Sequence, residues 1–333
     1  MRKYLNGHNV PLSMAVFLAT DNYDYEENTV SVTKLIKPVR QLILSGRVPQ
    51  AQSLEDVSGL VKSRMGSAIH DAIERSWVEH KEKAMVALGY PKRLIDRVKV
   101  NPDPAEVTED DIPVYLEQRS YKEVMGYTIS GKFDFVAEGR VEDFKSTSTM
   151  AWNSESKAED YSLQGSLYRW LNPEIVTDDH MAINFLFTDF QPFRAKTDPN
   201  YPPHATPQKL IPLKSVDETD QYVRNKLALI EKYKDAPEAE IPLCNDKELW
   251  RKEPEWKYYK NPEKRSRSTK NFKVDEFGSE NAARSAAYTR LAKDKNVGVV
   301  VEVSGEVLAC KYCAAFPICS QKDALIADGS LKL

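Results

Sequence analysis

The chain has 333 residues, 29% of them charged and 41% hydrophobic, and its formal net charge is −3. This length favours about two domains, and the composition is that of an ordinary globular protein. A negative net charge excludes a uniformly basic nucleic-acid-binding protein, so any contact with DNA has to come from a local basic patch.

The sequence also carries information about the compartment. No apolar run approaches the roughly 18 residues of a membrane span. The first residues, Met1-Arg2-Lys3, lead into polar sequence rather than into the apolar segment of a signal peptide. The four cysteines are too few for a disulfide scaffold in a chain of this length. We therefore expect a cytoplasmic protein.

The N-terminal part of the sequence predicts an extension followed by two helices. Residues 1–30 form the extension, and N-capping residues precede a first helix over Lys34–Ser45. Apolar residues at helical spacing predict a second, longer helix over Val57–Leu88. This helix carries His70, a candidate metal ligand. The alternative is that His70 is a partly buried histidine without a ligand role.

A mainly antiparallel sheet of at least three strands is predicted next. Val114–Ser120 is the first strand, and its Glu117 is either a site carboxylate or part of a solvated strand face. Aromatic and β-branched residues predict a second strand over Tyr127–Ala137 and a third over Arg140–Thr147. The intervening Glu138-Gly139 suits the two-residue loop of a tight hairpin.

The predicted hairpin brings two carboxylates together. With a two-residue loop, Asp134 lies opposite Asp143, and the alternation of side chains along a strand puts Lys145 on the same face. Two facing carboxylates are stable when a cation lies between them, and oxygen ligands favour Mg²⁺ or Mn²⁺. A nearby lysine could position or deprotonate an attacking water. The alternative is a surface hairpin with alternating charges.

A helix over Lys157–Leu171 is predicted after a polar loop. Its Gln164 and Tyr168 are four residues apart, so they share one face close to the carboxylate strands. The alternative is an ordinary amphipathic helix with an apolar core stripe. The elements predicted further on are a buried strand over Met181–Phe187, an irregular loop over Gln191–Pro207, a strand over Leu210–Val216 and a helix over Glu218–Lys234.

Residues 244–309 are predicted to be an inserted module. Between Trp250 and Val274, nine lysines and arginines stand against three glutamates, and nine minus three gives a local charge of +6. Cations interleaved with aromatic residues suit nucleic acid, because phosphates take the charge and bases stack on the rings. The alternative is a hairpin whose aromatic residues pack on a helix over Glu280–Lys293. The candidate DNA-binding residues are Trp256, Tyr258, Lys264, Arg265, Arg267 and Lys270.

The last part of the chain, residues 310–333, is rich in cysteine. Cys310, Cys313 and Cys319 follow the spacing C-x₂-C-x₅-C, and with Cys244 they make four thiolates that could meet. Four thiolates fit tetrahedral Zn²⁺ or an iron–sulfur cluster. The alternative is a set of free buried thiols.

Four short motifs of the predicted helices and strands occur along the chain in the order Gly66-x-x-x-His70, Asp134, Asp143-x-Lys145 and Gln164-x-x-x-Tyr168. In order and spacing they resemble the RecB-like branch of the PD-(D/E)XK nuclease superfamily. The resemblance covers roughly residues 31–172, and the cysteine triplet is similar to one that many of these nucleases carry. It implies an α/β (α+β) fold, with a mixed central sheet flanked by helices, and a nuclease core over residues 31–243.

The resemblance also implies an activity. The implied activity is that of a metal-dependent DNA nuclease, with an exonuclease in recombination, repair or genome processing as the first candidate. The implied partner is a helicase or recombination protein. The implied metal ligands for Mg²⁺ or Mn²⁺ are His70, Asp134, Asp143 and the carbonyl of Phe144. Lys145 is then expected at the attacking water, and Gln164 and Tyr168 at the substrate strand or the lysine.

For the cysteines the resemblance implies a 4Fe–4S cluster, with Zn²⁺ as the alternative occupant. Many relatives place the fourth cysteine upstream of the nuclease motifs, whereas here Cys244 lies downstream. Two other functions stay open. One is a structure-specific or single-strand endonuclease, and the other is a nucleic-acid-binding adaptor on a nuclease scaffold.

Overall fold

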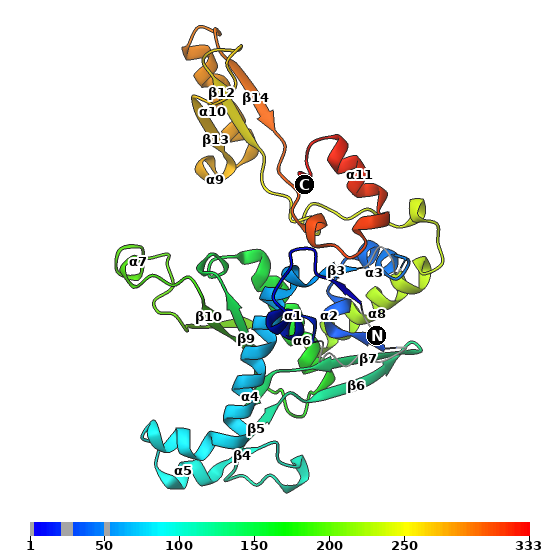
Figure 1. The fold of residues 1–333 in the computed structure, drawn as a ribbon, viewed down its shortest axis with the longest axis vertical. Helices are drawn as coiled ribbons and strands as arrows, with labels where there is room; N and C mark the ends of the chain where they lie inside the picture. The colour runs from blue at the N-terminus through cyan, green and yellow to red at the C-terminus, as the bar shows by residue number, and fades with distance from the viewer. Residues whose placement is uncertain (1–2, 21–28, 50–53) are drawn as a thin grey trace. The chain divides into compact units, whose positions relative to one another are not determined.

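The computed structural model describes residues 3–20, 29–49 and 54–333. The contacts within the chain divide it into two compact units (Figure 1). The first unit comprises Met1–Lys37 and Leu54–Glu231, and the second comprises Pro38–Ser53 and Lys232–Leu333. The expected module and cysteine-rich segment therefore share a unit with residues 38–53, a segment that the sequence analysis places in the nuclease core.

A six-stranded mixed sheet forms the centre of the first unit. The β9–β10 and β4–β5 pairs are parallel, and the other pairs are antiparallel. This mixed sheet with helices beside it confirms the predicted fold class. In the order β11-β10-β9-β8-β5-β4, the strands are Gln208–Pro212, His180–Phe187, Arg140–Thr147, Phe135–Ala137, Ile112–Leu116 and Val98–Val100.

Two helices cover this sheet on opposite faces. The long helix α4, Val61–Ala87, packs Trp77 on Phe135 with ring centroids 5.2 Å apart. Helix α6, Glu155–Leu171, packs in the core cluster that contains the next residue of β8, Val136. Because consecutive side chains of a strand point to opposite faces, α4 and α6 lie on the two sides of β8. Further elements of this unit are β1 Tyr4–Leu5, paired with β3 Glu55–Asp56, and helices α1 Leu12–Ala19, α2 Val32–Leu35, α5 Lys92–Arg97 and α7 Pro192–Thr197. Helix α8, Val216–Tyr233, begins in this unit and ends in the second.

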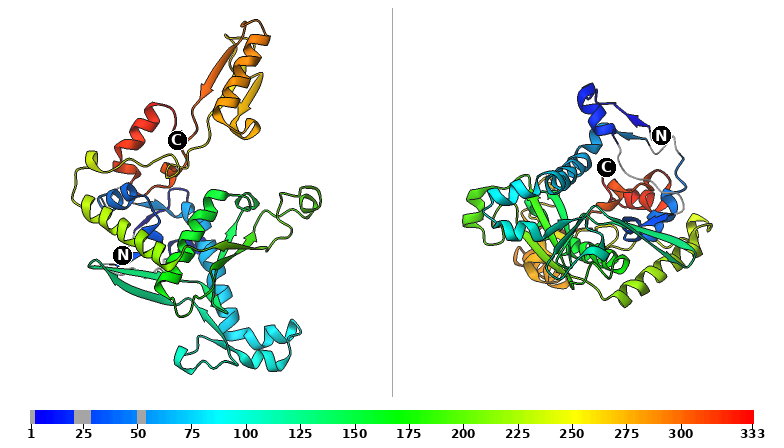
Figure 2. Two further views of the ribbon diagram at one scale, coloured as in Figure 1. Left: turned by 180° about the vertical axis from the view of Figure 1, so that it is seen from behind. Right: turned by 90° about the horizontal axis from the view of Figure 1, so that it is seen from below.

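A separate three-stranded sheet changes the expected strand boundaries. Its order is β2-β7-β6, with bounds Thr29–Ser31, Tyr127–Lys132 and Arg119–Val124. The β6–β7 hairpin extends away from the six-stranded sheet (Figure 2). The predictions of single strands over Val114–Ser120 and Tyr127–Ala137 are therefore wrong. Each stretch crosses from one sheet to the other, the first at Glu117 and the second at Asp134.

The crossing between the sheets is fixed by the backbone. The N–H of Glu117 donates to the carbonyl of Asp134 over 3.0 Å, and the N–H of Phe133 donates to the carbonyl of Gln118 over 3.2 Å. Glu117 has a φ of 51°, in the left-handed region that residues other than glycine rarely adopt. The bend places the two acidic residues side by side where both strands leave the central sheet.

Proline accounts for two further differences from the predicted elements. The predicted helix Lys34–Ser45 is wrong as a single helix, because Pro38 lacks an N–H and instead precedes a new helix, α3, over Val39–Ser45. The stretch Gln191–Pro207, predicted to be irregular, contains helix α7. Its Pro192 occupies the first helical position, where no N–H is needed.

The second unit contains a small sheet covered by one helix. Strand β12, Glu255–Tyr259, lies between β13, Lys270–Lys273, and β14, Val299–Val303. Helix α10, Glu280–Lys293, has the predicted bounds and lies against this sheet (Figure 1). Its Ala283 and Ala287 are buried in the core of the module. The short elements that remain are α9 Val274–Phe277, the 3₁₀ turns Glu238–Glu240, Ala309–Tyr312 and Phe316–Ile318, and α11 Ser320–Ala327. Within the described residues, no helix has both the length and the apolar character needed to cross a membrane.

Candidate active site and cysteine centre

The β8–β9 hairpin has the predicted two-residue turn. Glu138 and Gly139 have φ values of 49° and 79°, so both take the left-handed conformation of a type I′ turn. Ala137 pairs with Arg140, and Phe135 pairs with Glu142. Continued by one residue, this register sets Asp134 opposite Asp143.

His70 approaches this hairpin from α4. Its Nε2 lies 2.9 Å from the carbonyl oxygen of Phe144, and its Nδ1 lies 3.4 Å from Oδ2 of Asp134. The same Asp134 oxygen accepts a hydrogen bond of 3.2 Å from the N–H of Phe144. Burial lowers the pKa of His70, but the hydrogen bond and charge of Asp134 and the Phe144 carbonyl outweigh it and raise that pKa to about 9. This raised pKa favours the protonated, positively charged ring beside the two carboxylates.

Asp143 is the most enclosed carboxylate of the site, with an exposure of 2%. Its Oδ2 lies 2.6 Å from Nζ of Lys145, and its Oδ1 accepts a hydrogen bond of 3.2 Å from Nε2 of Gln164. Burial raises the pKa of Asp143; the charge of Lys145 opposes that rise and the charge of Asp134 adds to it. Gln164 also donates to the hydroxyl of Tyr168 over 3.0 Å. The sequence motifs on α6 and β9 therefore meet in one hydrogen-bonded group.

The structure adds two residues to the predicted set. Glu117, which the sequence leaves open, contributes an oxygen that lies within 4.8 Å of the ligand atoms of both His70 and Asp134. Its Oε2 also lies 2.5 Å from Nζ of Lys132. Tyr161 places its ring 5.6 Å from Nζ of Lys145. Its position three residues before Gln164 on α6 is the sequence signal that could have identified it.

The donors present fit a hard divalent cation. Carboxylate and carbonyl oxygens with one imidazole suit Mg²⁺ or Mn²⁺. Among the described residues, the buried Oδ2 of Asp143 meets no aligned hydrogen-bond donor beyond its ion pair with Lys145, so this oxygen is available as a ligand. No close approach requires a glycine at position 66, since a Cβ there would meet Ser146 Oγ at an ordinary distance of 3.8 Å.

The four cysteines lie in the second unit as free thiols. Cys244 and Cys310 pack against a common apolar cluster that includes Leu249 and Val307. Burial, then the charge of Glu248, then the other three cysteines raise the pKa of Cys244 to about 12, so Cys244 lies within electrostatic reach of the C-terminal triplet. In the described chain, no three of these sulfurs lie within 4.8 Å of one another. A single zinc ion would hold them about 3.8 Å apart.

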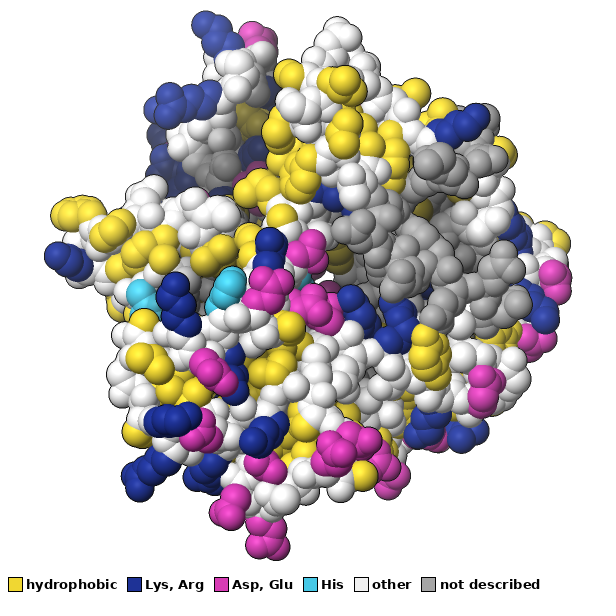
Figure 3. Space-filling view, turned by 60° about the horizontal axis from the view of Figure 1, so that its bottom comes forward, with side chains coloured by type: hydrophobic (Ala, Val, Ile, Leu, Met, Phe, Trp, Pro, Cys, Tyr) yellow, Lys and Arg dark blue, Asp and Glu magenta, His cyan; other side chains and the backbone are white. Residues whose placement is uncertain are grey.

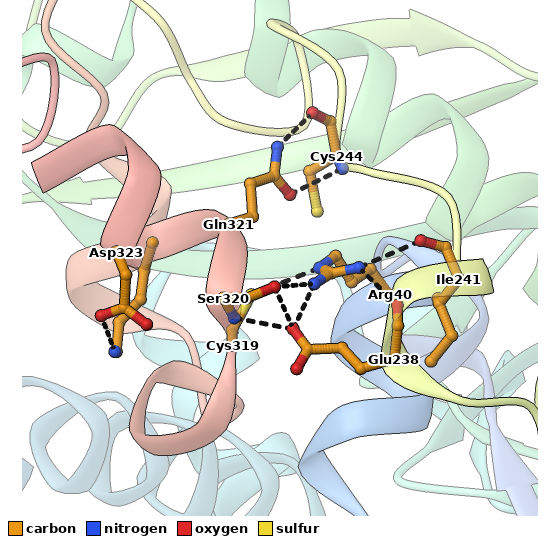
Figure 4. Close-up of polar contacts among 9 residues, drawn as sticks. Arg40, Glu238, Ile241, Cys244, Cys319, Ser320, Gln321 and Asp323 are labelled. Atoms are coloured by element: carbon orange, nitrogen blue, oxygen red, sulfur yellow. Dashed lines mark hydrogen bonds and ion pairs between the residues drawn. The ribbon is translucent and has the colours of Figure 1, made fainter. Parts of the chain in front are cut away.

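A glutamine that the sequence analysis does not single out joins the two halves of this cysteine group. The side chain of Gln321, on α11, accepts a hydrogen bond of 2.9 Å from the N–H of Cys244 and donates one of 2.8 Å to its carbonyl oxygen (Figure 4). The paired bonds fix the backbone of Cys244 next to the residues that follow Cys319. The upstream cysteine is thereby held beside the C-terminal triplet.

The aromatic residues expected to stack on DNA are in the core of the module. Trp256 and Tyr258 have exposures of 2% and 0% and pack with Phe272 against α10. Their rings have no open face for a base, so this part of the DNA-binding prediction is corrected in favour of the packed hairpin. The lysine and arginine candidates are exposed; they are Lys264, Arg265, Arg267 and Lys270. On the face of the molecule in Figure 3, basic and acidic side chains are interspersed without one continuous basic surface.

Comparison with known proteins does not assign a family. No family model matches the chain, and no curated protein matches it. Among solved structures it is similar to the crystal structure of SSO0001, with 13% sequence identity and a TM-score of 0.40, over 66% of this chain and 88% of that chain. A likeness of this size carries no argument about function, so the case rests on the site.

Proposed function

We propose that the first unit is a metal-dependent nuclease that hydrolyses phosphodiester bonds in DNA. The observation that carries the proposal is the meeting of His70, Asp134 and the Asp143-Lys145 pair at one end of the β8–β9 hairpin. These groups come from helix α4, the residue before β8 and strand β9, and they have the order that resembles RecB-like nucleases. A protein that only binds nucleic acid has no need for a buried carboxylate, a lysine and an imidazole in one place.

The metal would be held by donors that the fold already gathers. When bound, Mg²⁺ or Mn²⁺ would lower the pKa of a coordinated water and neutralise charge that develops on the phosphate. The residues that would hold it are His70, Asp134, Asp143 and the carbonyl of Phe144, with Glu117 as a further carboxylate. A proton must leave His70 before its nitrogen can serve as a ligand.

Lys145 has a defined part in this proposal. Burial lowers its pKa, but the charge and hydrogen bond of Asp143 outweigh burial and raise it above the ordinary value. The amine therefore stays protonated at neutral pH. As an ammonium it would position the attacking water and stabilise negative charge on the phosphate.

Residues of α6 keep this lysine and its partner in place. Gln164 bridges Asp143 and Tyr168, and Tyr161 lies beside Lys145. Because Tyr168 is only 5% exposed, its hydroxyl orients Gln164 rather than reaching a substrate. In this proposal, Gln164 is then the residue of the pair that would contact the scissile strand.

We favour an exonuclease in recombination, repair or genome processing, because the motif order resembles that branch of nucleases. In this proposal the protein works on DNA ends in the cytoplasm, together with a helicase or recombination protein. The competing activity is a structure-specific endonuclease. Digestion of end-labelled linear DNA and closed circles, with and without Mn²⁺, separates the two. An exonuclease degrades only the linear form, whereas nicking of closed circles would support the endonuclease.

For the second unit we propose a 4Fe–4S cluster on Cys244, Cys310, Cys313 and Cys319. The C-x₂-C-x₅-C spacing of the triplet, which resembles that of cluster-bearing nucleases, favours this cluster over Zn²⁺. The role is structural, since phosphodiester hydrolysis transfers no electrons. The cluster would join Cys244 to the C-terminal triplet and so close the loop between them.

A further inference from the structure

A buried arginine contacts the cysteine centre from another part of the chain. Arg40, on α3, is 3% exposed. Its Nε donates to Sγ of Cys319 over 3.3 Å, and one terminal nitrogen donates to the carbonyls of Glu238 and Ile241 over 3.3 and 3.0 Å. The other terminal nitrogen donates to Oγ of Ser320 over 3.2 Å and to a carboxylate oxygen of Glu238 (Figure 4). All five N–H groups of the guanidinium are used.

The charge balance of this network does not require the sulfur. A buried guanidinium needs a compensating anion, and the carboxylate of Glu238 supplies it. The same carboxylate oxygen also accepts hydrogen bonds of 2.7 Å from the N–H and the hydroxyl of Ser320. Since Glu238 already neutralises Arg40, ion pairing does not explain the hydrogen bond from Arg40 to the sulfur of Cys319.

The chemistry of sulfur offers that explanation. A neutral thiol is a weak hydrogen-bond acceptor, whereas a thiolate accepts from a charged donor strongly. A metal-bound cysteine is a thiolate. An arginine N–H directed at Cys319, from a guanidinium that is already neutralised, is therefore the arrangement expected around a metal-ligand sulfur.

We propose that Arg40 is a positioning residue of the cysteine centre, which holds the sulfur of Cys319 as a ligand and donates its N–H to that sulfur in the occupied centre. The inference rests on the proposed cluster and not on the nuclease site. Ser320 and Gln321, which directly follow Cys319, connect that ligand to Arg40 and to Cys244. Three chain segments that are distant in sequence are thereby tied at one point.

The proposal predicts an electronic effect as well as a structural one. A hydrogen bond and a positive charge beside a cluster sulfur stabilise the reduced cluster, which has gained one electron and carries one more negative charge. No proton moves in this step, and dithionite can supply the electron in the experiment. Removing the Arg40 contact should therefore shift the midpoint potential to a more negative value.

The full chain is purified without oxygen as wild type, Arg40→Lys, Arg40→Gln and the control Arg47→Gln. Arg47 also ties the α3 segment to distant carbonyls, those of Tyr233 and Lys234, at 3.1 and 2.8 Å, but these bonds involve no cysteine. We expect both Arg40 variants to release iron to a chelator faster than wild type and to show the negative shift in midpoint potential. Arg47→Gln should match wild type in both measurements.

Three outcomes would overturn the proposal. One is an unchanged potential and unchanged iron release in Arg40→Lys. Another is an Arg47→Gln variant that loses iron as fast as Arg40→Gln, since that would show a general packing effect. The third is a wild-type protein without iron or zinc. If zinc is present, the Co²⁺-substituted proteins are compared, and the thiolate-to-metal absorption band of the Arg40 variants should shift. None of these outcomes affects the nuclease proposal, which is tested at Asp143.

Discussion

At the scale of single residues, the site is defined by a buried ion pair. Asp143 and Lys145 are 2.6 Å apart, and the side chain of Asp143 is almost fully enclosed. Removing one partner of a buried pair leaves the other charge uncompensated, at a cost of about 3–5 kcal/mol. Lys145 keeps some contact with solvent, so the lower end of that range applies. Both Asp143→Ala and Asp143→Asn remove the charge of Asp143, but Asp143→Asn keeps the shape of the side chain and an oxygen that can accept from Gln164. Asp143→Asn is therefore the variant that better separates lost catalysis from lost packing.

Glu117 gives a prediction about metal affinity. Glu117→Gln removes a carboxylate charge within 4.8 Å of His70 and Asp134 but keeps the shape of the side chain. We expect the Mn²⁺ dissociation constant to rise by about 10-fold, measured by calorimetry on the purified protein. Glu79→Gln, an exposed carboxylate on the same helix as His70, is the control and should leave the constant unchanged. An unchanged constant in Glu117→Gln would restrict that residue to its ion pair with Lys132.

At the scale of elements, the sequence predicts turns and helices better than it predicts sheet membership. The Glu138-Gly139 turn and the bounds of α10 follow from local chemistry, since glycine and capping residues fix them. The alternation of side chains continues through Glu117 and Asp134 without interruption, so no local signal marks the crossing between the two sheets. The proximity of Asp134, Asp143 and Lys145 follows from the register of the hairpin, and the expectation for His70 follows from the order of the motifs. The contribution of Glu117, by contrast, depends on that crossing.

The turn itself supplies a stability prediction. A Cβ on Gly139 would lie 2.2 Å from Oγ1 of Thr177, at a φ of 79°. Gly126, in the β6–β7 turn, has a φ of 80° and nothing within 4 Å of the same position. Gly126→Ala should cost only the left-handed strain, about 1–2 kcal/mol. Gly139→Ala should cost at least about 1 kcal/mol more, because it adds a clash.

Urea unfolding of both glycine variants measures this difference. Equal losses of unfolding free energy in Gly139→Ala and Gly126→Ala would contradict the close packing of the β8–β9 turn against Thr177. Since the turn fixes the register of Asp134 and Asp143, we also expect the Gly139 variant alone to lose cleavage activity at a temperature where both proteins are folded.

The Arg40 network predicts how stability depends on pH. Burial raises the pKa of Glu238, but the hydrogen bonds from Ser320 and the charge of Arg40 outweigh it and hold that pKa below its ordinary value. A lowered carboxyl pKa adds stability above the unfolded value of about 4.3, and this stability is lost as pH falls through the folded value. Glu238→Gln should therefore be less stable than wild type at pH 7, and the difference should shrink on acidification.

Calorimetric melting temperatures between pH 7 and about pH 3.5 test this dependence. Glu240→Gln, an exposed neighbour in the same 3₁₀ turn, should follow the wild-type curve throughout. A difference between Glu238→Gln and wild type that is constant with pH would contradict the assigned charge state.

At the scale of the whole molecule, the chain combines a candidate catalytic unit with a unit that carries the cysteines and an exposed basic loop. Within that second unit, Trp256, Tyr258 and Phe272 belong to the core of the module, so the exposed lysines and arginines of its loop would meet DNA through charge. Phosphate contacts of this kind steer and hold a strand without reading its sequence. In the proposed nuclease, the basic loop of the module would hold the substrate rather than select it.

Salt dependence measures that role. Replacing Lys264, Arg265 and Arg267 by alanine should weaken DNA binding and reduce the slope of log affinity against log salt by about 2 to 3, because each phosphate contact contributes about 0.7–0.9. The variant should keep its melting temperature, since all three side chains are exposed. An unchanged slope would mean that this loop does not meet DNA.

The central claim is that the residues gathered around Asp143 hydrolyse DNA with a divalent metal. The most direct measurement is the rate at which wild type and Asp143→Asn degrade end-labelled linear DNA in Mn²⁺ and in EDTA, with melting temperatures recorded for both. We predict Mn²⁺-dependent degradation by wild type and a loss of at least about 100-fold in the folded variant. Degradation by Asp143→Asn at close to the wild-type rate, or a wild-type rate that does not depend on metal, would contradict the claim.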